Sequence, residues 1–218
     1  MQRHLALCAA FLALSIPSLA WGPEGHRVVA DVAANHLNAA ARRQIRDLLG
    51  NDDLAAISTW ADEIRNERRE TFFWHFVDIP WNANSFSDSR DCSRAADPRS
   101  PQIQDRHECV VDKILEFQRI LSDRNAGRLQ RTEALKFLVH FVADLHQPMH
   151  AIGEARGAND IHITEFGNRD CGGRPCNLHF LWDMGLIEHA RRSEPDYVTL
   201  LEKLISEANL QNRATGTP

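Results

Sequence analysis

The chain has 218 residues, of which 43% are hydrophobic and 25% are charged, and its formal net charge at pH 7 is −5. This composition is typical of one globular domain with a sizeable core. The negative charge argues against a protein that coats DNA passively, because such proteins usually present a basic surface. It does not exclude an enzyme whose local positive charge comes from a bound metal.

The beginning of the chain has the pattern of an export signal. A short basic start precedes an apolar stretch over 5–16 that is too short to span a bilayer. Small residues then occupy the two positions that a signal peptidase reads, the second being Ala20. We therefore expect a signal peptide over 1–20 and a mature domain over 21–218 that begins with Trp21 and is secreted or periplasmic. The alternative is a buried N-terminal helix or an uncleaved anchor.

The hydrophobic periodicity of the remaining chain predicts a mainly α, single compact domain. Helices are expected over 25–37, 39–49, 54–68, 108–121, 132–145, 177–191 and 196–208. Asn38 and Thr132 are suited to cap the second and the fifth of these helices.

The segments between these helices differ in character. Aromatic and β-branched residues over 72–79 favour an extended segment that Pro80 ends. The polar stretch 82–104 is expected to form a surface loop. A second loop is expected over 151–175, with room for a small β-hairpin around 161–166.

Four cysteines follow the expected cleavage site: Cys92, Cys109, Cys171 and Cys176. An even number in an exported protein indicates two disulfide bonds, and three pairings are open. Short loops favour the pairs Cys92–Cys109 and Cys171–Cys176. A four-cysteine zinc site is less well supported, because neither pair has the two-residue spacing of common zinc sites.

The stretch 140–150 carries the most informative chemistry. His140 and Asp144 are four residues apart, so one face of the expected helix presents both. Pro148 ends or kinks the helix and lets the chain bring His150 back toward that face. Imidazole and carboxylate are the usual ligands of an exposed catalytic zinc site. The alternative is a polar helix face with unrelated histidines.

Other histidines and aspartates strengthen the metal interpretation. His179 and Asp183 repeat the four-residue spacing, Asp62 lies near an apolar stripe, and His75 lies inside an apolar run. A lone buried histidine is usually a hydrogen-bonded core residue. Several such residues together are harder to explain in that way, since unpaired buried polar groups cost free energy. A shared metal cluster would satisfy them together.

Six motifs follow one another between Trp21 and about Ile187: Trp21-Gly-x-x-Gly-His26, Trp60-Ala-Asp62-x-Ile-Arg65, His75-Phe-x-Asp78, His140-x-x-x-Asp144-x-His146-Gln-Pro148-x-His150, Gly157-x-Asn159 and Asn177-Leu-His179-x-x-Trp182-Asp183. In this order they resemble the zinc-dependent single-strand nucleases of the S-one and P-one type, which include plant bifunctional nucleases and bacterial relatives. The resemblance implies a helical fold of the phospholipase C and P-one nuclease type.

The resemblance also implies three zinc ions, with ligands carried over by position. They are Asp62, His75, His140 and Asp144 for the first zinc, His150, His179 and Asp183 for the second, and the α-amine and carbonyl of Trp21, His26 and a bridging Asp144 for the third. His146 matches a residue that is not a ligand, so it is expected to support the ligands from behind. The α-amine of Trp21 becomes a ligand only after the signal peptide is cleaved.

The implied reaction is hydrolysis of single-stranded DNA and RNA to 5′-phosphorylated products by a zinc-activated water. Arg65 would stabilise transition-state charge, Asp78 would orient the water, and Asn159 would support the cluster or contact the substrate. The alternatives are a surface ion pair for Arg65 and a strand-end cap for Asp78. Neither a stable membrane association nor a protein partner is implied. Family members usually continue further after the last motif, so the C-terminal part is expected to be shorter than usual.

Two other classes of protein share part of this pattern. A zinc phospholipase C has a similar three-zinc helical site with an N-terminal tryptophan, but the wording of the motifs around Asp62 and His179 favours a nuclease. A non-catalytic zinc-binding or zinc-storing exported protein would keep the ligands without turnover, and the presence of Arg65 and Asp78 argues against it. A DNA-binding regulator fits neither the expected export nor the acidity.

Overall fold

The computed structural model describes residues 21–94 and 106–208, and it confirms a mainly α fold. Its helical elements are α1 (Pro23–His36), α2 (Ala39–Leu49), α3 (Leu54–Ile57), α4 (Trp60–Ile64), η1 (Arg69–His75), α5 (Asp88–Asp91), α6 (Val110–Ser122), α7 (Arg128–Leu145), η2 (Pro148–His150), α8 (Ala155–Ala158), α9 (Leu178–Phe180), η3 (Leu181–Gly185), α10 (Leu186–Ala190) and α11 (Glu194–Glu207). Two short antiparallel strands, β1 (Ser93–Arg94) and β2 (Arg106–His107), pair Ser93 with His107. The expected signal peptide, 1–20, lies outside the described residues.

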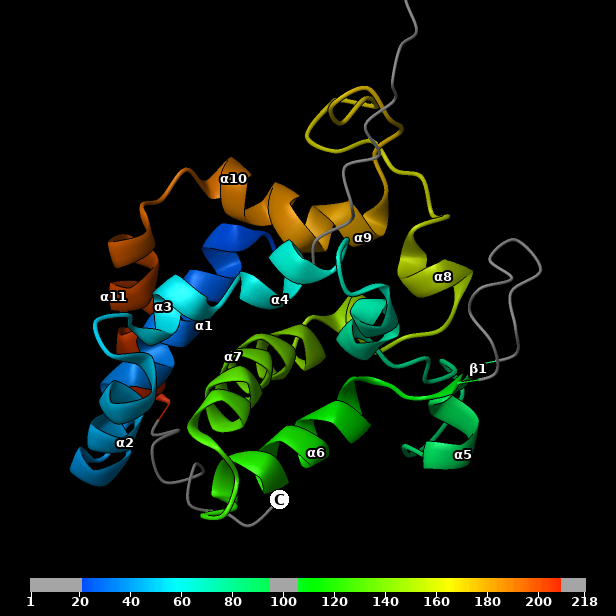
Figure 1. Ribbon diagram of the computed structural model, residues 1–218. Coiled ribbons are helices and arrows are strands. Elements are labelled where there is room, and N and C mark those ends of the chain that lie inside the picture. Colours follow the sequence, from blue (N-terminus) through cyan, green and yellow to red (C-terminus); the bar gives the residue numbers. More distant parts are fainter. Residues whose placement is uncertain (1–20, 95–105, 209–218) are drawn as a thin grey trace, which may run out of the picture.

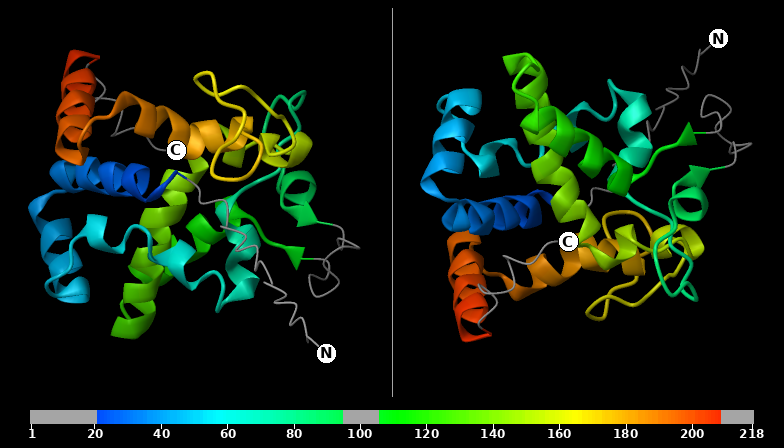
Figure 2. Two further views of the ribbon diagram at one scale, coloured as in Figure 1. Left: turned by 90° about the horizontal axis from the view of Figure 1, so that it is seen from above. Right: turned by 90° about the horizontal axis from the view of Figure 1, so that it is seen from below.

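The long helix α7 runs through the middle of the fold, and α6 packs along it (Figure 1). Helix α1 lies between α11 on one side and α3 on the other (Figure 2). Arg27 of α1 is joined to Glu194 of α11 by an ion pair of 2.7 Å. Helix α1 also contacts α7, and the indole N–H of Trp21, just before α1, donates to Ala143 O near the C-terminal end of α7.

Local sequence explains several helix ends. Pro23 occupies the first turn of α1, where its missing N–H costs no hydrogen bond. Asn38 caps α2 as expected, with its side chain accepting from the N–H of Ala41 at 2.9 Å. Gly50 follows α2 with a φ of +70°, a left-handed backbone conformation that favours glycine.

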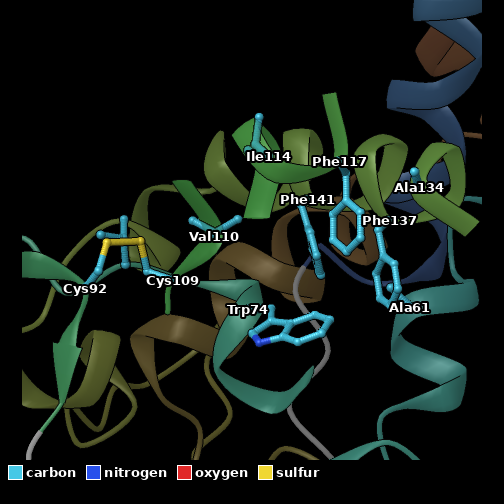
Figure 3. Packing of buried hydrophobic residues seen from close by; sticks show 11 residues of the cluster. Ala61, Trp74, Cys92, Cys109, Val110, Ile114, Phe117, Ala134, Phe137 and Phe141 are labelled. Carbon is cyan, nitrogen blue, oxygen red and sulfur yellow. A yellow bond between two sulfur atoms is a disulfide. The ribbon is translucent and has the colours of Figure 1, made fainter. Parts of the chain in front are cut away.

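The larger hydrophobic cluster lies between α6, α7 and η1 (Figure 3). The rings of Phe117 and Phe137 stack with centroids 4.7 Å apart, and Phe137 stacks on Phe141 at 5.2 Å. Trp74 meets the edge of Phe137 at 5.6 Å. This packing holds η1 against α7, so that His75 at the end of η1 lies beside His140 of α7.

Both disulfide bonds have the pairing that short loops favour: Cys92–Cys109 and Cys171–Cys176. The first joins the end of α5 to the start of α6 beside the hydrophobic cluster (Figure 3). Because all four sulfur atoms are used in these two disulfide bonds, the alternative of a four-cysteine zinc site is wrong. No helix in the described ranges combines the length and the apolarity needed to cross a membrane.

Several expected elements differ from the observed ones. Helix α7 begins four residues before Thr132, with Gly127 at its N-cap, and the Thr132 hydroxyl donates to Leu48 O at 3.3 Å. Thr132 is therefore not the cap. The single helix expected over 54–68 is divided into α3 and α4, and the first half of the segment expected to be extended, 72–75, belongs to η1.

Two further expectations concern the second half of the chain. The helix expected over 177–191 is α9, η3 and α10 in succession, with the wider π-helical turn at Leu181–Gly185. The hairpin expected around 161–166 is present only as isolated bridges, such as His162 with Asn177. Within the polar stretch 82–104, the structure shows α5 and β1, and 95–105 lies outside the described residues.

Candidate metal centre

Helix α7 supplies two adjacent buried groups, His140 and Asp144. Both are completely buried, and His140 Nε2 lies 3.2 Å from Asp144 Oδ2, as the four-residue spacing predicts. His75 comes from the end of η1, and its Nδ1 lies 2.9 Å from Asp144 Oδ2 and 3.1 Å from His140 Nε2. Asp62 of α4 completes this group, with Oδ1 3.7 Å from His75 Nδ1 and 3.8 Å from His140 Nε2.

A second group combines His150 of η2, His179 of α9 and Asp183 of η3. His150 Nε2 lies 3.7 Å from Asp183 Oδ1, and His179 Nε2 lies 3.1 Å from Asp183 Oδ2. The three side chains are buried, and one ligand atom from each lies within 4.8 Å of the others. The π-helical turn still brings His179 and Asp183 to the same side, so the expectation from their spacing is met despite the altered helix.

His26 extends the first group on the side of α1. Its Nε2 lies 3.3 Å from Asp144 Oδ1, and its ring stacks on His140 with centroids 3.9 Å apart. Trp21 lies beside α7, because its indole N–H donates to Ala143 O at 3.0 Å. The N–H of Gly22 donates to Asp183 O at 2.7 Å. The mature N-terminus expected from the sequence therefore lies between Ala143 and Asp183.

A close approach explains the second glycine in the first motif. A Cβ atom at Gly25 would lie 3.0 Å from Trp21 Cβ and 3.1 Å from Ile187 Cδ1. Glycine at this position lets Trp21 fold back over the first turn of α1 while α10 packs on the other side. The motif thus holds Trp21 against the first turn of α1, the turn that contains His26.

Backbone carbonyls fix the orientation of three of the histidine rings. The Nδ1 atoms of His140, His150 and His179 lie 2.6, 2.9 and 2.6 Å from the carbonyl oxygens of Ser58, His75 and Gly157. A ring that donates from Nδ1 presents a neutral Nε2 to the cluster, which is the form in which histidine binds a metal. His75 is reversed and turns its Nδ1 toward the cluster.

The cluster contains buried polar atoms that no protein group satisfies. Among the described residues, those of the cluster without a hydrogen-bond partner are His26 Nδ1 and Nε2, Asp62 Oδ1, His75 Nε2, Asp144 Oδ1 and His150 Nε2. Leaving such groups unpaired is costly, whereas a cation would accept the lone pairs of those that face the cluster: His26 Nε2, Asp62 Oδ1, Asp144 Oδ1 and His150 Nε2. This donor set of imidazoles and carboxylates fits zinc.

The charges of the cluster also suit a cation. Burial lowers the pKa of His26 to about 4 and that of His75 to about 3, so both rings are neutral near pH 7. For His140, burial is outweighed by Asp144 and Asp62, which raise its pKa to about 9. Burial raises the pKa of Asp62 to about 6. Without metal, a proton on His140 thus balances the negative charge of Asp144 and Asp62. A metal ion bound there would displace this proton.

The three further residues expected at the site have different surroundings. Arg65 is buried, and its Nη1 lies 3.6 Å from Asp62 Oδ1, so the alternative of a surface ion pair does not describe it. Asp78 follows His75 by three residues and is half-buried. The side chain of Asn159, two residues after Gly157, donates to Arg156 O at 2.9 Å.

His146, expected to support the ligands from behind, is exposed, and its Nδ1 lies 2.6 Å from Val142 O.

Two supporting residues, Gln147 and Gly157, were not given a role from the sequence. The neighbouring Gln147 is completely buried and donates to Asp183. Gly157, rather than Asn159, orients a candidate ligand, through its carbonyl oxygen and His179 Nδ1. The motifs contain both residues, but a role played by a backbone carbonyl leaves no side-chain signal.

The fold and the site define a mainly helical protein with a buried cluster of histidines and aspartates suited to several metal ions. A family model of the S1/P1 nucleases matches residues 21–217. The chain belongs to the S1/P1 nuclease family. It is 31% identical to nuclease S1 of Aspergillus oryzae over 100% of this chain and 71% of that protein. It is 30% identical to nuclease P1 of Penicillium citrinum, with 90% of this chain and 71% of that protein covered. Endonuclease 4 of Arabidopsis thaliana is 32% identical, with coverage of 89% and 64%.

Proposed function

We propose that this protein is a zinc-dependent endonuclease that hydrolyses single-stranded DNA and RNA and leaves 5′-phosphorylated products. Membership of the S1/P1 nuclease family supports the reaction class. The observation that carries the proposal is the convergence of His26, His75, His140 and His150 on carboxylates, with buried lone pairs left unsatisfied. Burying such unsatisfied groups without a cation costs free energy.

The family resemblance implies three zinc ions, and we propose that this chain's residues hold them as follows. Asp62, His75, His140 and Asp144 would hold the first, His150, His179 and Asp183 would hold the second, and His26, Asp144 and the α-amine and carbonyl of Trp21 would hold the third. The proximity of Asp144 Oδ1 to His26 and of Asp144 Oδ2 to His75 supports its role as a bridge. The anchoring of Trp21 to Ala143 supports the N-terminal ligand.

Bound zinc supplies a water whose pKa falls to about 7 and positive charge for the phosphate oxygens. The protein's own groups then orient the reaction. Arg65 is fixed beside Asp62 and contributes a positive charge to the developing phosphoryl transition state. Asp78 would accept a hydrogen bond from the attacking water and orient it for in-line attack, a task that suits a half-buried carboxylate three residues after the ligand His75. Asn159 adds a polar contact for the substrate at the edge of the site.

We further propose that 1–20 are a signal peptide and that the mature domain, 21–218, acts outside the cytoplasm, in the periplasm or the medium. Two disulfide bonds fit an oxidising compartment. Cleavage before Trp21 creates the α-amine that the third zinc site requires. The preference for single strands follows from the chemistry, since a base must leave the stack to bring its phosphate to a buried metal.

The substrate assignment is tested with the purified protein beginning at Trp21. Single-stranded DNA, RNA, duplex DNA and a phosphocholine lipid are offered in parallel, and acid-soluble nucleotide and released phosphocholine are measured. The proposal predicts cleavage of both single-stranded polymers, slower cleavage of the duplex, and product ends that a 5′-phosphatase can dephosphorylate. Release of phosphocholine without nucleotide, or zinc binding without any turnover, would contradict it.

A further inference from the structure

Gln147 occupies an unusual position between the two groups of candidate ligands. It is completely buried, although glutamine is mostly exposed in folded proteins unless its amide is hydrogen-bonded. It follows the last turn of α7 and forms the N-cap of η2, the turn that carries His150. None of the roles assigned to the zinc ligands requires a glutamine at position 147.

Both ends of the Gln147 amide are used. Nε2 donates to Asp183 Oδ1 at 2.5 Å, and Oε1 accepts from the N–H of Met149 at 2.5 Å. The main chain of Gln147 is used as well, since its N–H donates to Asp144 O at 3.0 Å and its carbonyl accepts from the N–H of His150 at 2.9 Å. One residue therefore bonds to Asp144, His150 and Asp183.

The two carboxylate oxygens of Asp183 have different neighbours. Oδ1 accepts from Gln147 and lies 3.7 Å from His150 Nε2, whereas Oδ2 faces His179 Nε2 at 3.1 Å. A neutral amide donor fixes the carboxylate plane without adding charge to the cluster. A lysine would add a competing cation, and an acid would repel Asp183 unless it kept its proton.

We propose that Gln147 is a positioning residue that holds the Asp183 carboxylate in the orientation needed by the His150–His179–Asp183 zinc site. This inference rests on the proposed zinc-dependent function. Partners that orient metal ligands from behind are worth about 10- to 100-fold in metal affinity. Gln147 is expected to contribute in that range to one zinc ion and to leave the other two unaffected.

The test compares Gln147→Met with Gln130→Met in the full mature chain. Methionine keeps the length of the side chain and removes the amide. Gln130 lies at the opposite end of α7 and makes a hydrogen bond to the N–H of Gly127, so it is a matched loss of one amide away from the cluster. Bound zinc is counted by chelator competition, and visible absorption of the cobalt-substituted proteins reports ligand geometry.

The wild-type protein and Gln130→Met are expected to bind three zinc ions with equal affinity. Gln147→Met is expected to hold two normally and one about 10- to 100-fold more weakly, with an altered cobalt spectrum. Three normal sites, or equal weakening of all three, would overturn the inference while leaving the nuclease proposal intact. A wild-type protein that binds no zinc would instead refute the proposed function on which the inference rests.

A second measurement avoids dependence on the folding of the variant. The side-chain amide protons of Gln147 in the wild-type protein can be followed by nitrogen-15 NMR, with selective glutamine labelling for assignment. Burial and the bond to Asp183 predict slow exchange with water, before and after zinc is added. Exchange as fast as that of the exposed Gln130 amide would contradict the contact with Asp183.

Discussion

Asp144 and His26 meet through the carboxylate oxygen that faces α1, with Asp144 Oδ1 3.3 Å from His26 Nε2. The other oxygen faces the opposite side and lies 2.9 Å from His75 Nδ1. One buried carboxylate in α7 thus joins a histidine from the first helix to a histidine from η1. This division of its two oxygens is the geometry expected of a bridge between two metal ions.

Replacing Asp144 is therefore expected to disturb two zinc sites at once. Asp144→Asn keeps the size of the side chain but removes the charge, and it should leave one tightly bound zinc ion, held by His150, His179 and Asp183. Asp183→Asn is the matched control, because it should weaken only that one ion. Zinc counts by mass spectrometry under native conditions distinguish the variants. Loss of a single ion in Asp144→Asn would contradict the bridge.

The proposed N-terminal ligand predicts an unusual sensitivity to chain extension. One alanine added before Trp21 converts the α-amine into a peptide nitrogen, which is a poor metal ligand. The variant is expected to bind two zinc ions tightly and to lose most of its activity, although Trp21 can still donate to Ala143. Metal content and turnover equal to those of the unextended protein would contradict this assignment.

Gly157 is expected to tolerate no side chain. Its φ is +63°, a Cβ atom would lie 2.6 Å from Met149 O, and its carbonyl orients His179. Gly157→Ala should destabilise the protein by more than the ~1–2 kcal/mol typical of a left-handed alanine, and should weaken zinc binding. Gly172→Ala is the control, because Gly172 has a φ of +72° with open space around it. Urea unfolding and zinc titration of both variants check the difference.

Arg65 is expected to act on the reaction rather than on metal binding. Arg65→Ala should keep three zinc ions and lower kcat by about 10²–10³-fold, the usual effect of removing one preorganised stabilising group. Arg68 provides the comparison, since it pairs with Glu70 and Glu133 away from the cluster. Arg68→Ala should retain nearly full kcat. Steady-state kinetics on a single-stranded oligonucleotide, with zinc content measured in parallel, separate the two cases.

The pKa shifts predict how the stability of the chelator-treated protein depends on pH. His26 and His75 have folded pKa values of about 4 and about 3, below the ordinary 6.5, so their contribution is lost as pH falls from 6.5. The folded pKa of Asp62 is about 6, above its ordinary 3.8, so this carboxylate favours the folded state as pH falls. Its effect offsets only part of the loss, because one group opposes two histidines. The contribution of His140 is present below pH 6.5 and is lost as pH rises through about 9.

Maximum stability without zinc is therefore expected near pH 6.5. Added zinc should move the maximum to higher pH, because metal displaces the proton that His140 otherwise carries. Thermal unfolding across pH 4–10, with and without zinc, measures both curves. A metal-free curve that rises steadily to pH 9 would show that these buried groups are not arranged as described.

Sequence patterns were informative where a side chain acts directly. The pairs His140–Asp144 and His179–Asp183 were visible from helical spacing, and both lie together as expected. The pairing of the cysteines also followed from short loops. These features depend on residues that are near one another in the chain, for which local geometry decides the outcome.

The remaining features depend on contacts between distant segments. Thr132 has the chemistry of a cap, yet α7 extends past it because Gly127 already offers a start and the helix packs on α6. The aromatic run before Pro80 was expected to be extended, but burial of Trp74 against Phe137 favours the tighter η1. The buried amide of Gln147 became visible only once Asp183 lay next to it.

The most direct test of the account is the zinc content of the protein beginning at Trp21, measured on the same sample as its cleavage of single-stranded DNA. The account predicts close to three zinc ions per chain, and cleavage that a chelator abolishes and added zinc restores. Three ions without cleavage would show a metal-binding protein that is not a nuclease. Little bound zinc in a folded protein would contradict the central claim, because the buried histidines and aspartates would then have another purpose.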